Sequence, residues 1–147
     1  MKITFLSFVL FISFFATAQQ LSPVEKKLVQ TVEQQMDQTL QLLRQSVDIN
    51  SGTYNIAGVR AVGELYAKEL RALGFTVEWI LLPDSLKRAG HLVAYRKGIK
   101  GKKLFLIGHL DTVFEPDMPT NPFTLLNDST ATGQGVNDMK GGDVAII

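Results

Sequence analysis

Cysteine is absent from the 147 residues of this sequence. Its absence excludes disulfide bonds and thiolate metal sites, so any bound metal must be held by His, Asp or Glu. Only two histidines are present, and the formal net charge is +1. The sequence also lacks a basic patch with interleaved aromatic residues, which argues against a nucleic-acid partner.

The first 18 residues have the pattern of a secretory signal peptide. Lys2 precedes an apolar stretch from Phe5 to Phe15, and Ala16-Thr17-Ala18 supplies the small residues of a cleavage site. The stretch is short for a stable membrane anchor, because a spanning helix needs about 20 apolar residues. We therefore expect residues 1–18 to direct export to the periplasm or the extracellular space. An uncleaved N-terminal anchor is the alternative.

Residues 19–147 are enough for one small domain, and they begin with two predicted helices. Ser22, Pro23 and Glu25 form a helix start with a capping box, and apolar residues recur every four positions to about Ser46. Asn55 is suited to cap a second helix, which Gly74 ends. We expect both helices to be amphipathic, with Val59, Val62, Tyr66, Leu70 and Leu73 as the buried face of the second.

Three β-rich segments follow, and with the helices they predict an α/β fold. We expect strands over Phe75–Leu82 and His91–Arg96, and a central strand over Leu104–Ile107, where the run is apolar on both faces. The predicted architecture is a mixed sheet whose central strand is flanked by helices. Pro116–Gly135 is expected to be a long exposed loop, and a further helix begins after Lys140.

His109 and Asp111 stand at the carboxyl end of the predicted central strand, where α/β proteins collect ligands. Neutral imidazole is a good zinc ligand, and its other ring N–H needs a fixed acceptor. Residues i and i+2 of an extended segment share a side, so Asp111 is expected to orient His109. The alternative is a strand-end histidine beside a capping aspartate. His91 has no carboxylate at a ligand-like spacing, and we expect it to be structural or exposed.

Asp138 lies in a glycine-rich segment from Gly133 to Gly142. The glycines do not have the spacing of a dinucleotide-binding fingerprint. A carboxylate at Asp138 is able to bridge two divalent ions about 3.5–4 Å apart. The alternative is that Asp138 caps the helix that follows.

Together, "GHLDTV" at 108–113 and "GQGVNDMKGG" at 133–142 resemble the paired signature of the aminoacylase/glutamate carboxypeptidase family of dinuclear zinc metallopeptidases. "SGTYN" at 51–55, "ALGF" at 72–75 and "KLFLIGHLDTV" at 103–113 are similar to the glutamate carboxypeptidase branch. The resemblance runs from about Val47 to Ile147.

The resemblance implies that His109 ligates one of two Zn²⁺ ions, that Asp111 orients His109, and that Asp138 bridges the two ions. It implies the N-terminal part of a zinc-peptidase catalytic domain, without the family's smaller inserted domain, which often forms a homodimer. The glutamate pair that supplies the general base and a metal ligand in this family has no counterpart in the sequence.

From this resemblance we expect zinc-dependent hydrolysis of peptide or amide bonds in small peptides or N-acyl amino acids. This chain is expected to be an incomplete, inactive portion of such an enzyme. The alternative is a natural truncated remnant that binds metal without catalysis. Carboxypeptidase, dipeptidase and deacylase activities all stay open.

Overall fold

The computed structural model describes residues 20–147, and the contacts divide the chain into two units, residues 1–34 and 35–147. The predicted signal peptide at 1–18 lies outside the described residues. In the first unit the described residues are mainly the start of helix α1, Pro23–Asp48. The predicted capping box is confirmed, since the Ser22 backbone N–H donates to Glu25 Oε2 at 2.7 Å and the Glu25 N–H donates to Ser22 Oγ at 3.3 Å. Across residues 20–147, no helix has both the length and the apolar character needed to cross a membrane.

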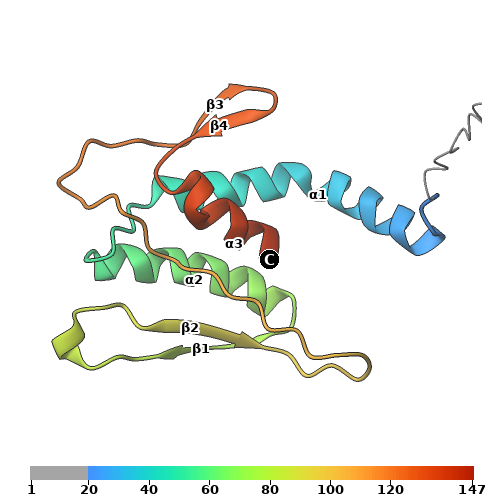
Figure 1. Ribbon diagram of the computed structural model, residues 1–147, viewed down its shortest axis with the longest axis horizontal. Coiled ribbons are helices and arrows are strands. Elements are labelled where there is room, and N and C mark those ends of the chain that lie inside the picture. Colours follow the sequence, from blue (N-terminus) through green and yellow to red (C-terminus); the bar gives the residue numbers. More distant parts are fainter. Residues whose placement is uncertain (1–19) are drawn as a thin grey trace, which may run out of the picture. The chain divides into compact units, whose positions relative to one another are not determined.

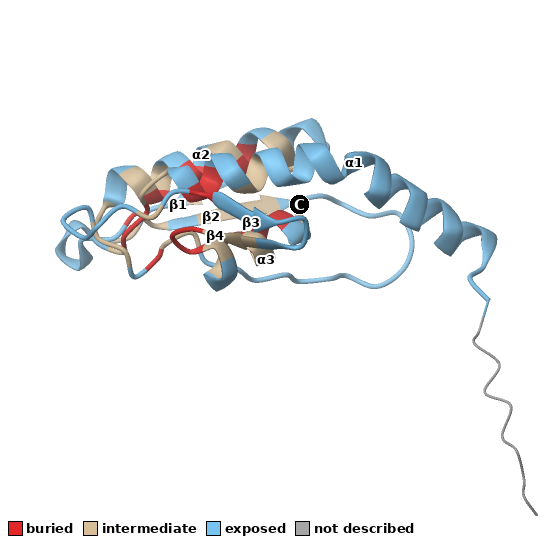
Figure 2. Ribbon diagram, turned by 90° about the horizontal axis from the view of Figure 1, so that it is seen from above, coloured by how far each residue is buried: buried red, intermediate tan, exposed pale blue. Residues whose placement is uncertain are grey.

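The apolar face of α1 is exposed over most of its length (Figure 2). The exposed side chains along this face include Val24, Leu28, Val32, Met36 and Leu40. Only the last turns, in the second unit, reach a core: Val47 is fully buried, and Leu42 and Leu43 are partly buried. The predicted helix is therefore confirmed, but among the described residues only the side chains near its C-terminal end are buried by other parts of the chain.

Helix α2, Ile56–Ala72, is the second predicted helix. The Asn55 side chain accepts a hydrogen bond from the Gly58 N–H at 3.1 Å, which satisfies one of the free donors of the first turn. Gly74 follows the helix with a φ of +83°, a left-handed conformation that favours glycine. Val59, Val62 and Tyr66 are buried as predicted, whereas Leu73 is exposed.

An antiparallel hairpin follows α2 (Figure 1). Strand β1, Thr76–Ile80, pairs with β2, His91–Tyr95, from Thr76 opposite Tyr95 to Ile80 opposite His91. A short 3₁₀ turn, η1, Asp84–Leu86, lies in the connection. Both strands were predicted at these places, and α2 contacts both of them.

The predicted central strand is not confirmed. Residues 104–107 belong to no strand and are drawn in Figure 1 as a plain trace, and their side chains are exposed. A strand needs backbone partners on a neighbouring strand, and residues 20–147 provide none at this place. The described residues form two antiparallel pairs rather than one mixed sheet.

The predicted long loop at 116–135 is wrong in part, because it contains a second hairpin. Strand β3, Thr124–Asn127, pairs with β4, Thr130–Thr132. Asn127 Oδ1 accepts hydrogen bonds from the backbone N–H and the hydroxyl of Ser129, which closes the turn. Turn residues between two short threonine-containing segments were the sequence signal that could have predicted this hairpin.

The hydrophobic core of the second unit joins α2 to the C-terminal helix α3, Gly141–Ile146. Val62 and Tyr66 of α2 and Val144 of α3 are its buried members. Several partly buried side chains pack around them: Leu42, Leu43, Ile49, Leu65, Leu92, Leu110 and Ile147. This packing holds residue 110, and with it the segment around His109, against the helices.

Lys140 is a fully buried charged residue at the end of a short helical turn, η2, Val136–Lys140. Its ammonium group donates to the carbonyl oxygens of Ser46 at 2.7 Å and Ile49 at 2.8 Å. Burial lowers the pKa of Lys140 to about 8, against the opposing effect of Asp48 and Asp143. The side chain thus ties the segment that carries Asp138 to the end of α1.

Asp143 in α3 is also buried, and one of its carboxylate oxygens has no hydrogen-bond partner. It packs against Gly108, where a Cβ atom would overlap the carboxylate. Burial raises the pKa of Asp143 to about 6, although the charges of His109 and Lys140 act in the opposite direction. A residue larger than glycine at 108 would displace this contact beside His109.

We expect Lys140→Met to lower the free energy of unfolding by about 2–4 kcal/mol, because two carbonyl oxygens lose a charged donor in a buried place. Urea unfolding followed by circular dichroism measures the change. The matched control is Lys68→Met at an exposed position of α2, for which we expect a change within about 0.5 kcal/mol. Equal unfolding midpoints for the two variants would contradict the role given to Lys140.

Asp143 predicts a pH dependence of stability. The carboxyl has a pKa of 3.8 when unfolded and about 6 when folded, so the folded state binds more protons between these values. Its contribution to stability is present below the lower pKa and is lost as the pH rises through the higher one.

We expect Asp143→Asn to remove this decline and to raise the free energy of unfolding by about 1–3 kcal/mol at neutral pH. Unfolding midpoints across this pH range, with exposed Asp37→Asn as control, measure it. A decline that persists in Asp143→Asn would assign it to another group.

Candidate metal site

Two segments far apart in the sequence meet in a single parallel bridge between Gly52 and Thr112. The Thr112 N–H donates to the Ser51 carbonyl at 2.8 Å, and the Thr53 N–H donates to the Thr112 carbonyl at 3.0 Å. The bridge sets residues 51–53, just before α2, beside the end of the extended segment that carries His109. It is the only place where that segment has a strand-like partner within residues 20–147.

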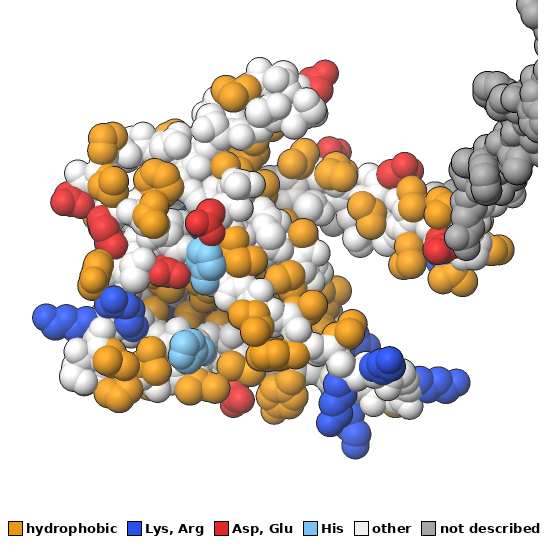
Figure 3. All heavy atoms as spheres, viewed as in Figure 1, with side chains coloured by type: hydrophobic (Ala, Val, Ile, Leu, Met, Phe, Trp, Pro, Cys, Tyr) orange, Lys and Arg blue, Asp and Glu red, His pale blue; other side chains and the backbone are white. Residues whose placement is uncertain are grey.

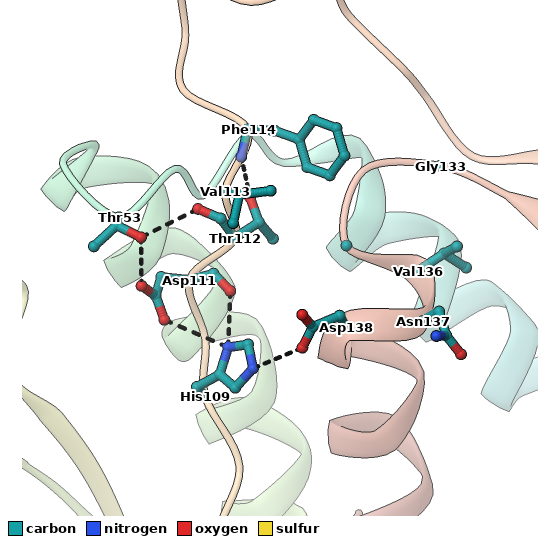
Figure 4. Close-up of a pocket in the computed structure, with 11 residues that line it drawn as sticks. Thr53, His109, Asp111, Thr112, Val113, Phe114, Gly133, Val136, Asn137 and Asp138 are labelled. Atoms are coloured by element: carbon teal, nitrogen blue, oxygen red, sulfur yellow. Dashed lines mark hydrogen bonds and ion pairs between the residues drawn. The ribbon is translucent and has the colours of Figure 1, made fainter.

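Both ring nitrogens of His109 face acceptors (Figure 4). Nδ1 lies 3.0 Å from the backbone carbonyl oxygen of Asp111 and 3.4 Å from its carboxylate oxygen Oδ1. Nε2 lies 2.9 Å from Oδ1 of Asp138. The imidazole is thus directed by Asp111 on one side and presents its other nitrogen to Asp138.

These contacts also affect protonation of the ring. Burial lowers the pKa of His109, but the hydrogen bonds to the Asp111 carbonyl and the Asp138 carboxylate, with the charges of both side chains, outweigh it and raise the pKa. A metal ion at Nε2 therefore competes with a proton for this nitrogen.

Residues 133–140 form a loop that brings the chain back toward His109. This segment carries Asp138 and is called the Asp138 loop. Gly135 has a φ of +74°, and a Cβ atom there would overlap Thr112, so the turn requires glycine. The loop is closed by the Lys140 N–H, which donates to the Gly135 carbonyl at 3.0 Å. Asp138 does not cap α3, because Lys140 occupies the capping position. The side chain of Asp138 is 80% exposed.

Asp111 has a second partner that its spacing does not predict. The Thr53 hydroxyl donates to Oδ2 of Asp111 at 2.6 Å, while Oδ1 is the oxygen nearer to His109. The two carboxylate oxygens of Asp111 are thus used by different residues. The Asp111 side chain is 35% exposed, less than His109 at 47%.

The three side chains His109, Asp111 and Asp138 line an open pocket of about 260 Å³. The segments 109–114 and 133–138 form most of its wall, and Thr53 completes it. The face drawn in Figure 3 presents histidine side chains together with several acidic side chains. His91, the other histidine, is exposed at the start of β2 and does not line the pocket.

The donors in this pocket fit a zinc ion in kind: an imidazole nitrogen and a carboxylate oxygen, both accessible. They do not fit it in number. Residues 20–147 contain no group of three His, Cys, Asp or Glu side chains close enough to hold a metal ion together, and zinc sites in proteins use three or four protein ligands. The described residues therefore bring two possible metal donors together without a third.

The structure brings together the three residues that the sequence singles out, although they lie up to 29 positions apart. Three further residues were not anticipated: Thr53 as the partner of Asp111, Lys140 as the anchor of the Asp138 loop, and Asp143 behind Gly108. Lys140 and Asp143 lie within or just after the recognised "DMKGG" segment, but neither was assigned a contact. Thr53 is separated from Asp111 by 58 positions, and no spacing rule links them.

Comparison with known proteins gives one informative similarity. The chain is 33% identical over 126 residues to carboxypeptidase G2 of Pseudomonas sp. (strain RS-16). The alignment covers 82% of this chain and 29% of that protein, so the chain spans less than a third of the length of this relative. No protein-family model matches the chain. Over most of its own length, the chain is thus similar to part of a carboxypeptidase.

Proposed function

We propose that this chain is part of the catalytic domain of a zinc-dependent hydrolase of the aminoacylase/glutamate carboxypeptidase family. The observation that carries the proposal is the 2.9 Å approach of His109 Nε2 to Asp138 Oδ1 in an open pocket. Two residues chosen from separate motifs meet there, with their donor atoms accessible. The similarity to a carboxypeptidase supports the same conclusion.

In this proposal each of the three side chains has one task. His109 would hold one zinc ion, and the Asp138 carboxylate would be a ligand shared between this ion and a second one. Asp111 holds the N–H of Nδ1 and so keeps the lone pair of Nε2 free for the metal. When bound, the zinc ions would polarise the scissile carbonyl and lower the pKa of a water molecule toward about 7.

The proposed substrates are small peptides or N-acyl amino acids. The word carboxypeptidase in the name of the relative favours substrates with a free terminal carboxylate. No cationic side chain lines the described pocket, so recognition of that carboxylate is assigned to residues outside the described part of the site. Deacylation and dipeptide cleavage are the other reactions of this class.

The second candidate is metal binding without catalysis. It is favoured by the number of donors, because residues 20–147 supply two ligands and the pocket contains no glutamate to act as a general base. We prefer the hydrolase, in which further ligands and a base complete the site, and this preference is supported by the shared pocket of His109, Asp111 and Asp138 and by the turn at Gly135. The apolar stretch at 5–15 supports our further proposal that the protein is exported.

The first test is zinc binding by the chain, measured by competition with a chromophoric chelator at mildly alkaline pH. We expect weak binding that His109→Ala and Asp138→Asn each reduce at least about tenfold, because a two-donor site loses half of its ligands. His91→Ala is the matched control and is expected to leave the affinity unchanged, since His91 is outside the pocket. Equal losses for His91→Ala and His109→Ala would overturn the assignment.

The second test is hydrolysis. We expect the chain with added zinc to release no measurable product from a dipeptide or an N-acyl amino acid, because it lacks a general base at the site. Liquid chromatography of the reaction detects the product. Turnover that disappears in His109→Ala would show that the described residues already form a working site and would refute the proposal that the site needs further residues.

A further inference from the structure

Thr53 belongs to a series of polar contacts that runs through the Asp111 carboxylate to the imidazole of His109. Its hydroxyl lies 2.6 Å from Oδ2 of Asp111, and Oδ1 of the same carboxylate lies 3.4 Å from His109 Nδ1 (Figure 4). A short O–H···O⁻ bond of this kind is charge-assisted and among the stronger hydrogen bonds in proteins. The contact therefore fixes the rotation of the Asp111 carboxylate.

The backbone of Thr53 is itself held in place. Its N–H donates to the Thr112 carbonyl at 3.0 Å, and the Thr112 N–H returns to Ser51 at 2.8 Å. The hydroxyl also lies 3.2 Å from the Thr112 carbonyl, but it has one proton, and the nearer, charged acceptor is Asp111. The side chain thus reaches Asp111 from a rigid parallel bridge rather than from a free loop.

The orientation of Asp111 matters because His109 has two acceptors near Nδ1. The backbone carbonyl of Asp111 lies at 3.0 Å, and the carboxylate at 3.4 Å. With the carboxylate held by Thr53, the carbonyl oxygen and Oδ1 of Asp111 both favour a proton on Nδ1. Nε2 then faces the pocket without a proton. Without the hydroxyl, a carboxylate that is one-third exposed can turn toward solvent.

We propose that Thr53 is a positioning residue that acts through Asp111 to orient His109 for metal binding. The inference rests on the proposed function, because it assigns Thr53 to the same metal site. The competing explanation is a purely structural role, in which the hydroxyl only links residues 51–53 to residue 112. If Thr53 positions His109, removal of the hydroxyl changes the metal affinity and the environment of the imidazole. If its role is structural, removal changes the free energy of unfolding.

The experiment compares Thr53→Val, which keeps the shape and removes the hydroxyl, with Thr53→Ser, which keeps the hydroxyl. Thr31→Val is the matched control, because it removes a threonine hydroxyl that donates to the Lys27 carbonyl within α1 and makes no hydrogen bond to the site residues. For each variant, zinc affinity, the ¹⁵N shifts of the His109 ring in the metal-free chain, and the urea midpoint are measured.

We expect Thr53→Val to weaken zinc binding about tenfold, the lower end of the range for partners that orient a metal ligand. It should shift the His109 ring ¹⁵N signals while the urea midpoint stays close to that of the unmodified chain. Thr53→Ser should restore both the affinity and the ring signals, and Thr31→Val should change neither. Thr53→Ala serves in place of the valine variant if the latter does not fold.

Unchanged affinity and ring signals in Thr53→Val, in a chain whose zinc binding depends on His109, would overturn the role of Thr53 and leave the proposed function intact. A loss of stability in Thr53→Val with unchanged ring signals would assign the hydroxyl a structural role instead. If zinc binding does not depend on His109, the proposed function fails. The ring signals of the metal-free chain still decide whether Thr53 controls the imidazole.

Discussion

A buried ammonium group must be hydrogen-bonded, and Lys140 meets this requirement with the carbonyl oxygens of Ser46 and Ile49. The bonds connect the end of α1 to the last residue of the Asp138 loop. The loop therefore cannot move away from the segment around His109 without exposing or stranding the charge. The anchored loop carries Asp138, whose Oδ1 lies 2.9 Å from His109 Nε2.

The site is built from backbone constraints as much as from its reactive side chains. Gly135 provides the left-handed turn of the loop, and Gly108 leaves room for the buried Asp143 directly beside His109. The bridge between Gly52 and Thr112 brings Thr53 to Asp111. Each of these contacts limits where His109 can point, and in the proposed function they would orient the imidazole before a metal binds.

The described residues bring the proposed metal ligands His109 and Asp138 together, but they supply fewer ligands than a zinc site needs. His109 and Asp138 approach each other at the pocket, and the described residues 20–147 contain no group of three His, Cys, Asp or Glu side chains placed to hold a metal ion. The apolar residues 104–107, which directly precede Gly108 and His109 in the sequence, are exposed in the described structure, whereas a run that is apolar on both faces is usually buried.

The sequence alone predicted the helices and the two strands of the first hairpin, and it singled out His109, Asp111 and Asp138, because capping residues, periodicity and short motifs are local properties. It overestimated the central strand at 104–107, since strand formation depends on partners elsewhere in space. Only the tertiary structure brought Thr53 to Asp111 and Lys140 to the end of α1. Those contacts join residues 58 and more than 90 positions apart, and no local pattern encodes such pairings.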